Sequence, residues 1–177
     1  AGRSGIGPVT KFDTSTFPVR IAGEVKNFDI TSYISAKDAR RMDTFIHFGL
    51  AAGMQAVRDA GLDKEGAVDP ERVGVSIGSG IGGLPLIEET KDEYNVAGVR
   101  KVSPFFVPGS IINMISGNLS IIFGFKGPNL AIVTACTTGT HSIGEAARLI
   151  EYGDADVMVA GGAESTVSPL GMGGFCA

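Results

Sequence analysis

Apolar residues recur along this chain with two different spacings, one typical of helices and one typical of buried strands. From Ser35 onward they repeat at every third or fourth position, which predicts one long amphipathic helix that ends before Gly61. A second, strongly apolar repeat predicts a helix over residues 111–122, interrupted at Gly117 and closed by Gly124. Helices of this kind must bury their apolar faces against another layer of structure.

Strands are predicted in other parts of the chain. Residues 72–77 and 156–164 are apolar runs, and the second is typical of strands that are buried on both faces of a parallel sheet. Residues 19–25 alternate well enough for a further strand. Residues 94–99 are predicted to form a loop, as are residues 103–108, where two prolines prevent a regular helix. The alternation of strands and helices predicts a single α/β domain for this chain of 177 residues.

The pattern changes most sharply at Cys136. A β-branched, apolar run over residues 129–135 predicts a buried strand, whereas residues 143–150 repeat at helical spacing and Gly153 stands at the helix end. The thiol would therefore lie at the carboxyl edge of the sheet, beside the unpaired N–H groups and the positive dipole end of a helix. That position favours a thiolate nucleophile and could also serve an oxyanion. The residues alone leave open the alternative that Cys136 is a small buried hydrophobe.

A glycine-rich hexad, residues 78–83 (GSGIGG), follows the strand at residues 72–77. It matches the spacing of dinucleotide-binding loops, but such sites also need an acidic residue about 20 positions further on, after the next strand. No Asp or Glu occurs between Gly98 and Asn129. We therefore favour the alternative that these glycines allow close packing in a turn.

Composition and charge narrow the classes of protein to which the chain can belong. Its formal net charge of -4 argues against general nucleic-acid binding, and no apolar stretch approaches the about 20 residues of a membrane helix. The two cysteines, Cys136 and Cys176, form no CxxC pair, and no two histidines stand at ligand spacing. Neither a disulfide framework nor a structural zinc site is expected, and a reducing compartment such as the cytoplasm fits best.

The first residues contain no Met or signal sequence, and residues 171–177 end without a polar tail, so we expect a piece of a longer protein. A cysteine nucleophile usually needs a base or a charged partner. His141 lies five residues after Cys136, which on a helix places it about 140° round and about 7.5 Å along, so it cannot easily reach the sulfur. If Cys136 is catalytic, the missing chain must hold its partners.

Six motifs, taken together and in this order, resemble the condensing-enzyme family of thiolase-like β-ketoacyl synthases. They run through the whole chain and are RRMD at 40–43, GSGIGG at 78–83, SPFFVP at 103–108, TACTTG at 134–139, GDADVMVAGGAE at 153–164 and LGMGGF at 170–175. The resemblance implies a layered α-β-α-β-α fold with a mostly parallel, mixed sheet. Residues 1–177 would form a single incomplete domain, the N-terminal half of the catalytic domain, without its first strand and its second half. Because the family's two active-site histidines and its lysine belong to that second half, the 177 residues alone are expected to be inactive.

The resemblance also assigns roles to individual residues. Cys136 matches the nucleophile that accepts the acyl chain, with its own backbone N–H forming part of an oxyanion hole. Ile81 matches the residue at the bottom of the acyl pocket, Phe106 one that reaches this pocket across a dimer interface, and Phe175 an aromatic residue beside the nucleophile. Five basic residues match positions that dock the acidic acyl carrier protein, although each could equally be a plain solvated residue: Lys37, Arg40, Arg41, Arg100 and Lys101.

The activity implied by the resemblance is fatty acid elongation. An acyl group moves to Cys136, and decarboxylation of a malonyl group on acyl carrier protein then drives a Claisen condensation. No cofactor or metal is expected, because the phosphopantetheine arm arrives on the carrier protein, and the full-length protein is expected to form a homodimer. Two alternatives stay open: a polyketide-type ketosynthase, and a catalytically silent chain-length or dimer partner of the same fold. The retention of Cys136 argues against the silent partner.

Overall fold

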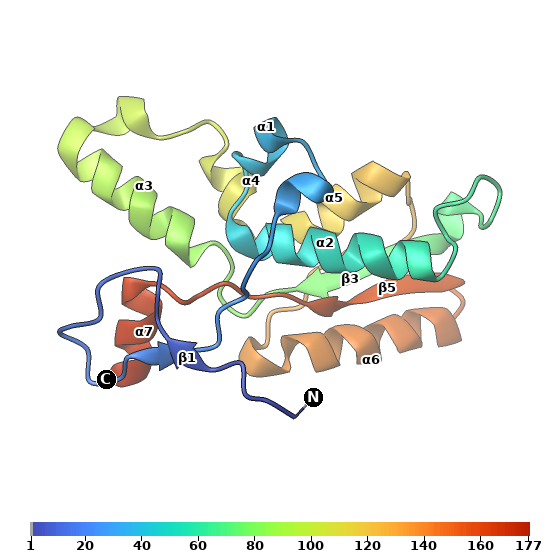
Figure 1. Ribbon diagram of the computed structural model, residues 1–177. Helices are drawn as coiled ribbons and strands as arrows, with labels where there is room; N and C mark the ends of the chain where they lie inside the picture. Colours follow the sequence, from blue (N-terminus) through green and yellow to red (C-terminus); the bar gives the residue numbers. More distant parts are fainter. Residues whose placement is uncertain (1) are drawn as a thin grey trace.

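The centre of the molecule is a three-stranded parallel sheet that lies between two layers of helices (Figure 1). The structure is a computed structural model and describes residues 2–177. The strands, in the order β4-β3-β5, are β4 Asn129–Leu130, β3 Val73–Gly78 and β5 Val157–Gly162. Helix α6 (Thr138–Glu151) covers one face of the sheet, and α2 (Thr44–Asp59) and α5 (Met114–Phe123) cover the other (Figure 1). The predicted α/β class is confirmed.

The remaining elements surround these layers. They are the helices α1 Ala36–Ala39, α3 Leu84–Ala97, α4 Phe106–Ser110 and α7 Pro169–Cys176, the 3₁₀ helices η1 Ile30–Ser32, η2 Pro70–Arg72, η3 Val99–Lys101 and η4 Ala135–Thr137, and the antiparallel strands β1 Gly7–Pro8 and β2 Ile21–Ala22.

Strand β3 is the buried centre of the sheet. All six of its residues are buried, and Val73, Val75 and Ile77 contribute to the hydrophobic core that α2 and α5 complete. It pairs with β5 along its whole length but with β4 at only two positions. The prediction that residues 156–164 are buried on both faces is wrong for β5, whose residues are half-buried or exposed. The reason is that β5 is an edge strand of the sheet within the described residues.

Helices α2 and α5 pack closely because glycines face large aliphatic side chains. A methyl group at Gly49 would lie 2.6 Å from two carbons of Ile115, and one at Gly53 would overlap Leu119. Both aliphatic residues are completely buried. Glycines one helical turn apart thus let the two backbones approach while the core stays filled.

The long helix predicted from Ser35 is in fact two helices, α1 and α2. Asp43 separates them because its side chain caps α2: Oδ1 accepts a hydrogen bond from the N–H of Phe45 (3.1 Å). Its other oxygen, Oδ2, accepts one from the N–H of Leu86 at the start of α3 (2.8 Å). Burial raises the pKa of the Asp43 carboxyl, although these N–H donors oppose the shift. Asp43 therefore joins two elements that are far apart in sequence.

Two of the predicted loops contain helix. Residues 94–99 were predicted as a loop, but α3 continues to Ala97 and ends at Gly98, which has a φ of 74°. Within residues 103–108, α4 begins at Phe106 despite its proline, because Pro108 lies in the first turn, where a backbone N–H has no helical partner. Both predictions are wrong in part.

Two further predictions from the apolar pattern concern residues 111–122 and residues 19–25. The helix predicted over residues 111–122 is found as α5, which begins three residues later, at Met114, and which Gly124 ends with a φ of 71°. Gly117 does not interrupt it. The strand predicted over residues 19–25 shrinks to β2, which pairs with only two residues of β1.

Candidate functional site

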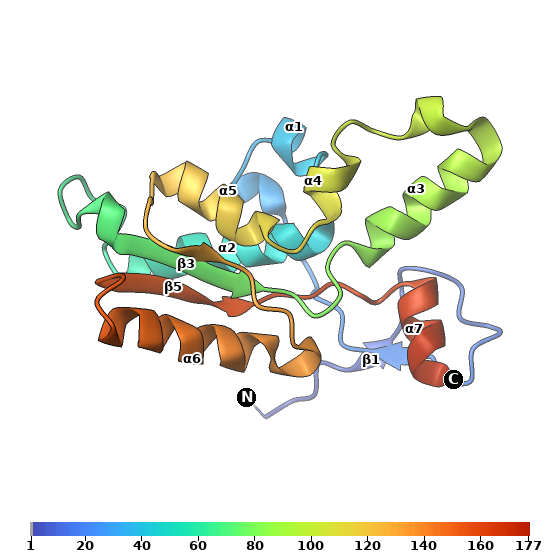
Figure 2. The ribbon, with the colours of Figure 1, turned by 180° about the vertical axis from the view of Figure 1, so that it is seen from behind.

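Cys136 lies in the corner between the sheet and helix α6, as predicted. The segment that follows α5 runs along β3 and passes its carboxyl end before α6 begins (Figure 2). Only Asn129–Leu130 of this segment pairs as a strand, and Cys136 follows in the short helix η4. The thiol is exposed and forms no disulfide. The alternative of a buried hydrophobe is therefore wrong for the described chain.

Ser116 of α5 explains why the strand before Cys136 is short. Its buried hydroxyl accepts a hydrogen bond from the N–H of Ile77 (2.9 Å) and lies 2.7 Å from the carbonyl oxygen of Leu130, to which it can donate. The side chain thus takes the place of strand-to-strand hydrogen bonds where the segment leaves β3. A helix residue, rather than the sheet, directs the chain toward Cys136.

The backbone at this corner is strained, and local hydrogen bonds hold it in place. Ala135, directly before Cys136, has a φ of 51°, a left-handed conformation that is costly for a residue with a Cβ. The N–H of Thr134 donates to the hydroxyl of Thr138 (3.0 Å), and Nδ1 of His141 lies 2.8 Å from Oγ1 of Thr134. His141 thus has a partner in this turn, and no hydrogen bond joins it to Cys136 within residues 2–177.

The thiol faces a cavity of about 380 Å³ at the carboxyl ends of β3 and β5. Two residues predicted to line an acyl pocket, Ile81 and Phe175, share this cavity with Cys136. Ile81 comes from the glycine-rich loop after β3, and Phe175 from α7. Both side chains are exposed, at 45% and 80% respectively. The structure therefore brings together residues that are 55 and 39 positions from Cys136 in the sequence.

Phe106 takes a different place. It is the first residue of α4, it is half-buried, and it does not line the cavity of Cys136 within the described chain. Because its predicted role is to reach the pocket of a second subunit, that role stays a prediction.

The five basic residues predicted to dock a carrier protein form two groups. Lys37, Arg40 and Arg41 lie in and after α1, and Arg100 and Lys101 lie in η3, the short turn that follows α3. Both groups are on the side of the molecule opposite α6 (Figures 1 and 2). Arg41 is half-buried, and the other four residues are exposed.

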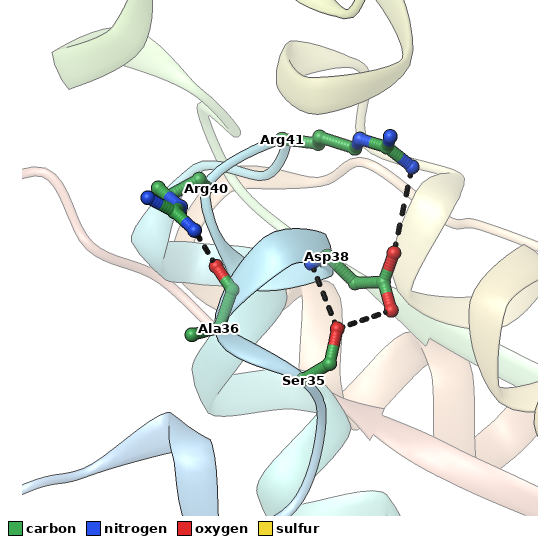
Figure 3. A network of polar contacts seen from close by, with 5 residues as sticks. All are labelled: Ser35, Ala36, Asp38, Arg40 and Arg41. Atoms are coloured by element: carbon green, nitrogen blue, oxygen red, sulfur yellow. Dashed lines mark hydrogen bonds and ion pairs between the residues drawn. The ribbon is translucent and has the colours of Figure 1, made fainter.

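Arg41 is tied to its neighbours more firmly than the other basic residues. Its guanidinium lies 3.5 Å from Oδ1 of Asp38 (Figure 3). It also lies 4.3 Å from the centre of the Phe105 ring. Arg40 donates from Nε to the carbonyl oxygen of Ala36 (3.1 Å), which leaves the rest of its guanidinium facing outward (Figure 3). An apolar groove of about 440 Å³, lined in part by Phe105, lies beside Arg41.

The glycine hexad is a close-packed turn. A methyl group at Gly78 would overlap the carbonyl oxygen of Ile132, and one at Gly83 would lie 2.6 Å from Cα of Ser110. This confirms the interpretation of these glycines as packing residues.

Sequence reasoning assigned no role to Glu164, which lines the cavity. Its carboxylate contacts the glycine loop at Ser79 and Ile81, more than 80 residues away in the sequence. Its place directly after an apolar strand was the available signal, because side chains there lie at the carboxyl edge of a parallel sheet. No group of three His, Cys, Asp or Glu side chains suited to a metal ion occurs in residues 2–177. Likewise, none of the helices described there is both long and apolar enough to span a membrane.

Comparison with known proteins extends over the whole chain. The sequence profile of the family "Beta-ketoacyl synthase, N-terminal domain" matches residues 1–177. The chain is 60% identical to the "3-oxoacyl-[acyl-carrier-protein] synthase 2" of Vibrio cholerae, with 99% of this chain and 42% of the relative covered. It is 53% identical to the protein of the same name from Coxiella burnetii, with 100% and 42% covered. The chain thus spans less than half the length of these curated relatives.

Solved structures show the same fold. A β-ketoacyl synthase from Burkholderia phymatum superposes with a TM-score of 0.83 at 24% identity, over 98% of this chain and 43% of the other. A type II polyketide ketosynthase, solved in complex with its acyl-carrier protein and bound to a hexaketide, gives a TM-score of 0.75 at 29% identity, over 84% and 43%. The predicted thiolase-like ketosynthase fold is confirmed. The thiol of Cys136 lies at the predicted corner, and the family profile matches all 177 residues. This chain therefore belongs to the β-ketoacyl synthase family and carries the N-terminal domain of that family.

Proposed function

We propose that the full-length protein is a 3-oxoacyl-[acyl-carrier-protein] synthase that elongates fatty acids, and that this chain supplies its acyl-accepting nucleophile. The observation that carries the proposal is the exposed Cys136 thiol, which opens onto a cavity shared with Ile81 and Phe175. Two relatives, at 60% and 53% identity, are both named 3-oxoacyl-[acyl-carrier-protein] synthase 2, which supports the same reaction.

The first step is acyl transfer. The Cys136 thiol gives up its proton, and the thiolate attacks the carbonyl carbon of an acyl thioester on the carrier's phosphopantetheine arm. The new C–S bond forms and the old one breaks, and the arm leaves as a thiolate that takes up the proton lost by Cys136. The N–H of Cys136 donates to no other group within residues 2–177, so it is free to stabilise the oxyanion of the tetrahedral intermediate.

The second step forms the new carbon–carbon bond. A malonyl group on a second carrier loses carbon dioxide, and the electron pair of the broken bond forms an enolate that attacks the carbonyl carbon of the Cys136 thioester. The C–S bond breaks, Cys136 leaves as a thiolate, and the 3-oxoacyl product stays on the carrier. The family resemblance assigns stabilisation of the enolate and oxyanion to two histidines of the second half. The reaction requires no metal and no organic cofactor besides the carrier's arm.

The cavity gives the proposed enzyme its acyl-chain preference. Ile81 would close the bottom of the acyl pocket and Phe175 would flank the nucleophile, because both line the cavity that contains the thiol. Phe106 would complete the pocket of the second subunit in a homodimer. Its half-buried position on α4, away from the cavity of its own chain, is compatible with that role.

Acyl carrier protein is the partner that the surface fits best. The family resemblance implies that the carrier protein is acidic. Positive charge is exposed on one side of this molecule, at Lys37, Arg40, Arg100 and Lys101. Arg41 lies beside the apolar groove, so this surface offers apolar contact as well as charge. A ketosynthase of the same fold was solved in complex with its acyl-carrier protein, which supports this kind of partner. We infer a cytoplasmic location from the two free cysteines.

A polyketide-type ketosynthase is the second candidate. It is favoured by the solved structures of a type II polyketide ketosynthase and of an ishigamide ketosynthase/chain length factor, but at only 29% and 27% identity. The relatives in fatty acid synthesis are about twice as similar in sequence.

Acylation of the full-length protein tests the proposal. Incubation with hexanoyl-acyl carrier protein should add one acyl group to the intact mass, and Cys136→Ala should abolish the addition. Cys176→Ala, which removes the other free thiol, is the matched control and should be acylated normally. Acylation that survives Cys136→Ala would refute the assignment of the nucleophile.

A further inference from the structure

Glu164 and the glycine loop form a second structural unit in the cavity of Cys136. Glu164 follows β5, and the loop, residues 79–83, follows β3. The paired register of the two strands places Gly162 beside Gly78, and the N–H of Ala163 extends the pairing by donating to the carbonyl oxygen of Gly78 (3.0 Å). The backbone of Glu164 is therefore positioned by the sheet, directly opposite the start of the loop.

Two hydrogen bonds join Glu164 to this loop, and a third lies within the loop. The hydroxyl of Ser79 donates to Oε1 of Glu164 (2.9 Å), and the N–H of Ile81 donates to Oε2 (2.9 Å). Oγ of Ser79, which is 1% exposed, also accepts a hydrogen bond from the N–H of Gly82 (3.1 Å). Both carboxylate oxygens are thus occupied by donors from the loop. This arrangement suits a structural acceptor rather than a group that removes a proton from substrate.

Gly80 connects this unit to the nucleophile. A methyl group at Gly80 would lie 2.8 Å from Oε2 of Glu164 on one side and 3.4 Å from Cα of Ala135 on the other. The loop therefore lies close to both the carboxylate and the strained residue that precedes Cys136. The position of Ile81 in the cavity follows from this arrangement.

We propose that Glu164 is a positioning residue that holds the loop of Ile81 in place and thereby sets the length of acyl chain that the cavity accepts. The inference rests on the proposed acyl transfer to Cys136. Without the carboxylate, the Ser79 hydroxyl and the Ile81 N–H lose their acceptors, and the loop is no longer held in one position. Ile81 then no longer limits the cavity at a fixed depth.

Glu164→Gln is the most specific variant, because it keeps the size of the side chain and changes only its charge and its hydrogen bonding. An amide offers one oxygen, so it can accept from Ile81 or from Ser79 but not from both in the observed geometry. Ser79→Ala removes the same connection from the loop side. Glu151→Gln, an exposed glutamate at the end of α6, is the matched control for loss of charge.

The experiment compares the rates at which full-length protein is acylated by myristoyl- and hexanoyl-acyl carrier protein. In Glu164→Gln and in Ser79→Ala, the myristoyl-to-hexanoyl ratio should rise about fivefold, which corresponds to one lost hydrogen bond of ordinary strength. The control Glu151→Gln should leave the ratio within about twofold of wild type. Ile81→Phe should lower the ratio, because a larger side chain shortens the cavity.

The outcomes separate this inference from the proposed function. If wild-type protein is not acylated on Cys136, the proposed function fails. If Cys136 is acylated but the ratio is unchanged in Glu164→Gln and Ser79→Ala, or both rates fall equally, only the role of Glu164 is overturned. Ser79→Ala carries the test alone if Glu164→Gln does not fold.

Discussion

Gly78, the last residue of β3, lies against the segment that leads to Cys136. Replacing it by alanine should lower both the stability of the protein and the rate of acyl transfer to Cys136. A methyl group there would overlap the carbonyl oxygen of Ile132 and would lie 2.6 Å from Cγ2 of Thr138. The first of these neighbours is backbone, so the overlap can be relieved only by moving the segment that leads to Cys136. Inserting a methyl group into a filled site typically costs 1–3 kcal/mol, and we expect about 3 kcal/mol here because the obstacle is backbone.

The shift should also slow acyl transfer. Displacing a reacting group by about 1 Å can lower a rate by up to about 100-fold, and the displaced segment carries the thiol four residues after Ile132. Gly161→Ala is the matched control: Gly161 lies on β5 with no atom of residues 2–177 within 4 Å of an added methyl group. Its stability should change by less than about 1 kcal/mol.

The assay is urea unfolding of the full-length variants at one fixed protein concentration, together with the rate of acylation by hexanoyl-acyl carrier protein. We expect Gly78→Ala to be both less stable and slower, and Gly161→Ala to resemble wild type. Equal behaviour of the two variants would refute the view that the segment before Cys136 is positioned by its contact with β3.

Two further predictions concern the α1–α2 turn and the basic surface. Asp43→Ala should lower stability by about 2–4 kcal/mol, because α2 loses its cap and the N–H of Leu86 loses its acceptor. Burial raises the pKa of Asp43 above 3.8, so ionising this carboxyl costs more free energy in the folded than in the unfolded state. The stability of the wild type should therefore fall as pH rises from about the ordinary pKa of Asp through the raised pKa of Asp43. Urea unfolding at a series of pH values should show that Asp43→Asn lacks this slope, and an unchanged slope would contradict the assignment. Lys37→Glu combined with Lys101→Glu should raise KM for acyl carrier protein in low salt, with little change in kcat. The control Lys64→Glu, in the loop after α2, should leave KM unchanged. A KM of the double variant equal to that of the wild type would show that Lys37 and Lys101 do not dock the carrier protein.

The parts of the fold that could be predicted are those encoded by neighbouring residues. The buried strand β3, the helix α5 with its glycine end, and the change from extended chain to helix at Cys136 all follow from patterns within about 20 residues. Helix α6 was predicted correctly because its first turn and its end at Gly153 lie within a single stretch. Local spacing also excluded His141 as a partner of the thiol, and in the structure its hydrogen bond goes to Thr134.

The parts that could not be predicted depend on partners far away in the sequence. The break between α1 and α2 involves the hydrogen bond from Leu86 to Asp43, which spans 43 positions. The short pairing of β4 depends on the Ser116 hydroxyl, and the fixed glycine loop depends on Glu164, 83 positions after Ile81. Side chains that replace or hold backbone hydrogen bonds leave no periodic signal, so only the folded chain shows them.

The resemblance to the condensing enzymes supplied what local patterns could not. It assigned Ile81 to the bottom of the acyl pocket and Phe175 to a place beside Cys136, and in the structure all three residues line one cavity. It did not reveal Glu164, since it assigned no role to that residue.

The central claim, that Cys136 accepts an acyl group, is tested most directly by mapping the acyl group on wild-type full-length protein. After incubation with acyl-carrier protein, the protein is digested at mildly acidic pH and its peptides are analysed by tandem mass spectrometry. The account predicts that the added mass lies on Cys136, with Cys176 unmodified. An acyl group found on Cys176 or on another residue, with Cys136 unmodified, would contradict it.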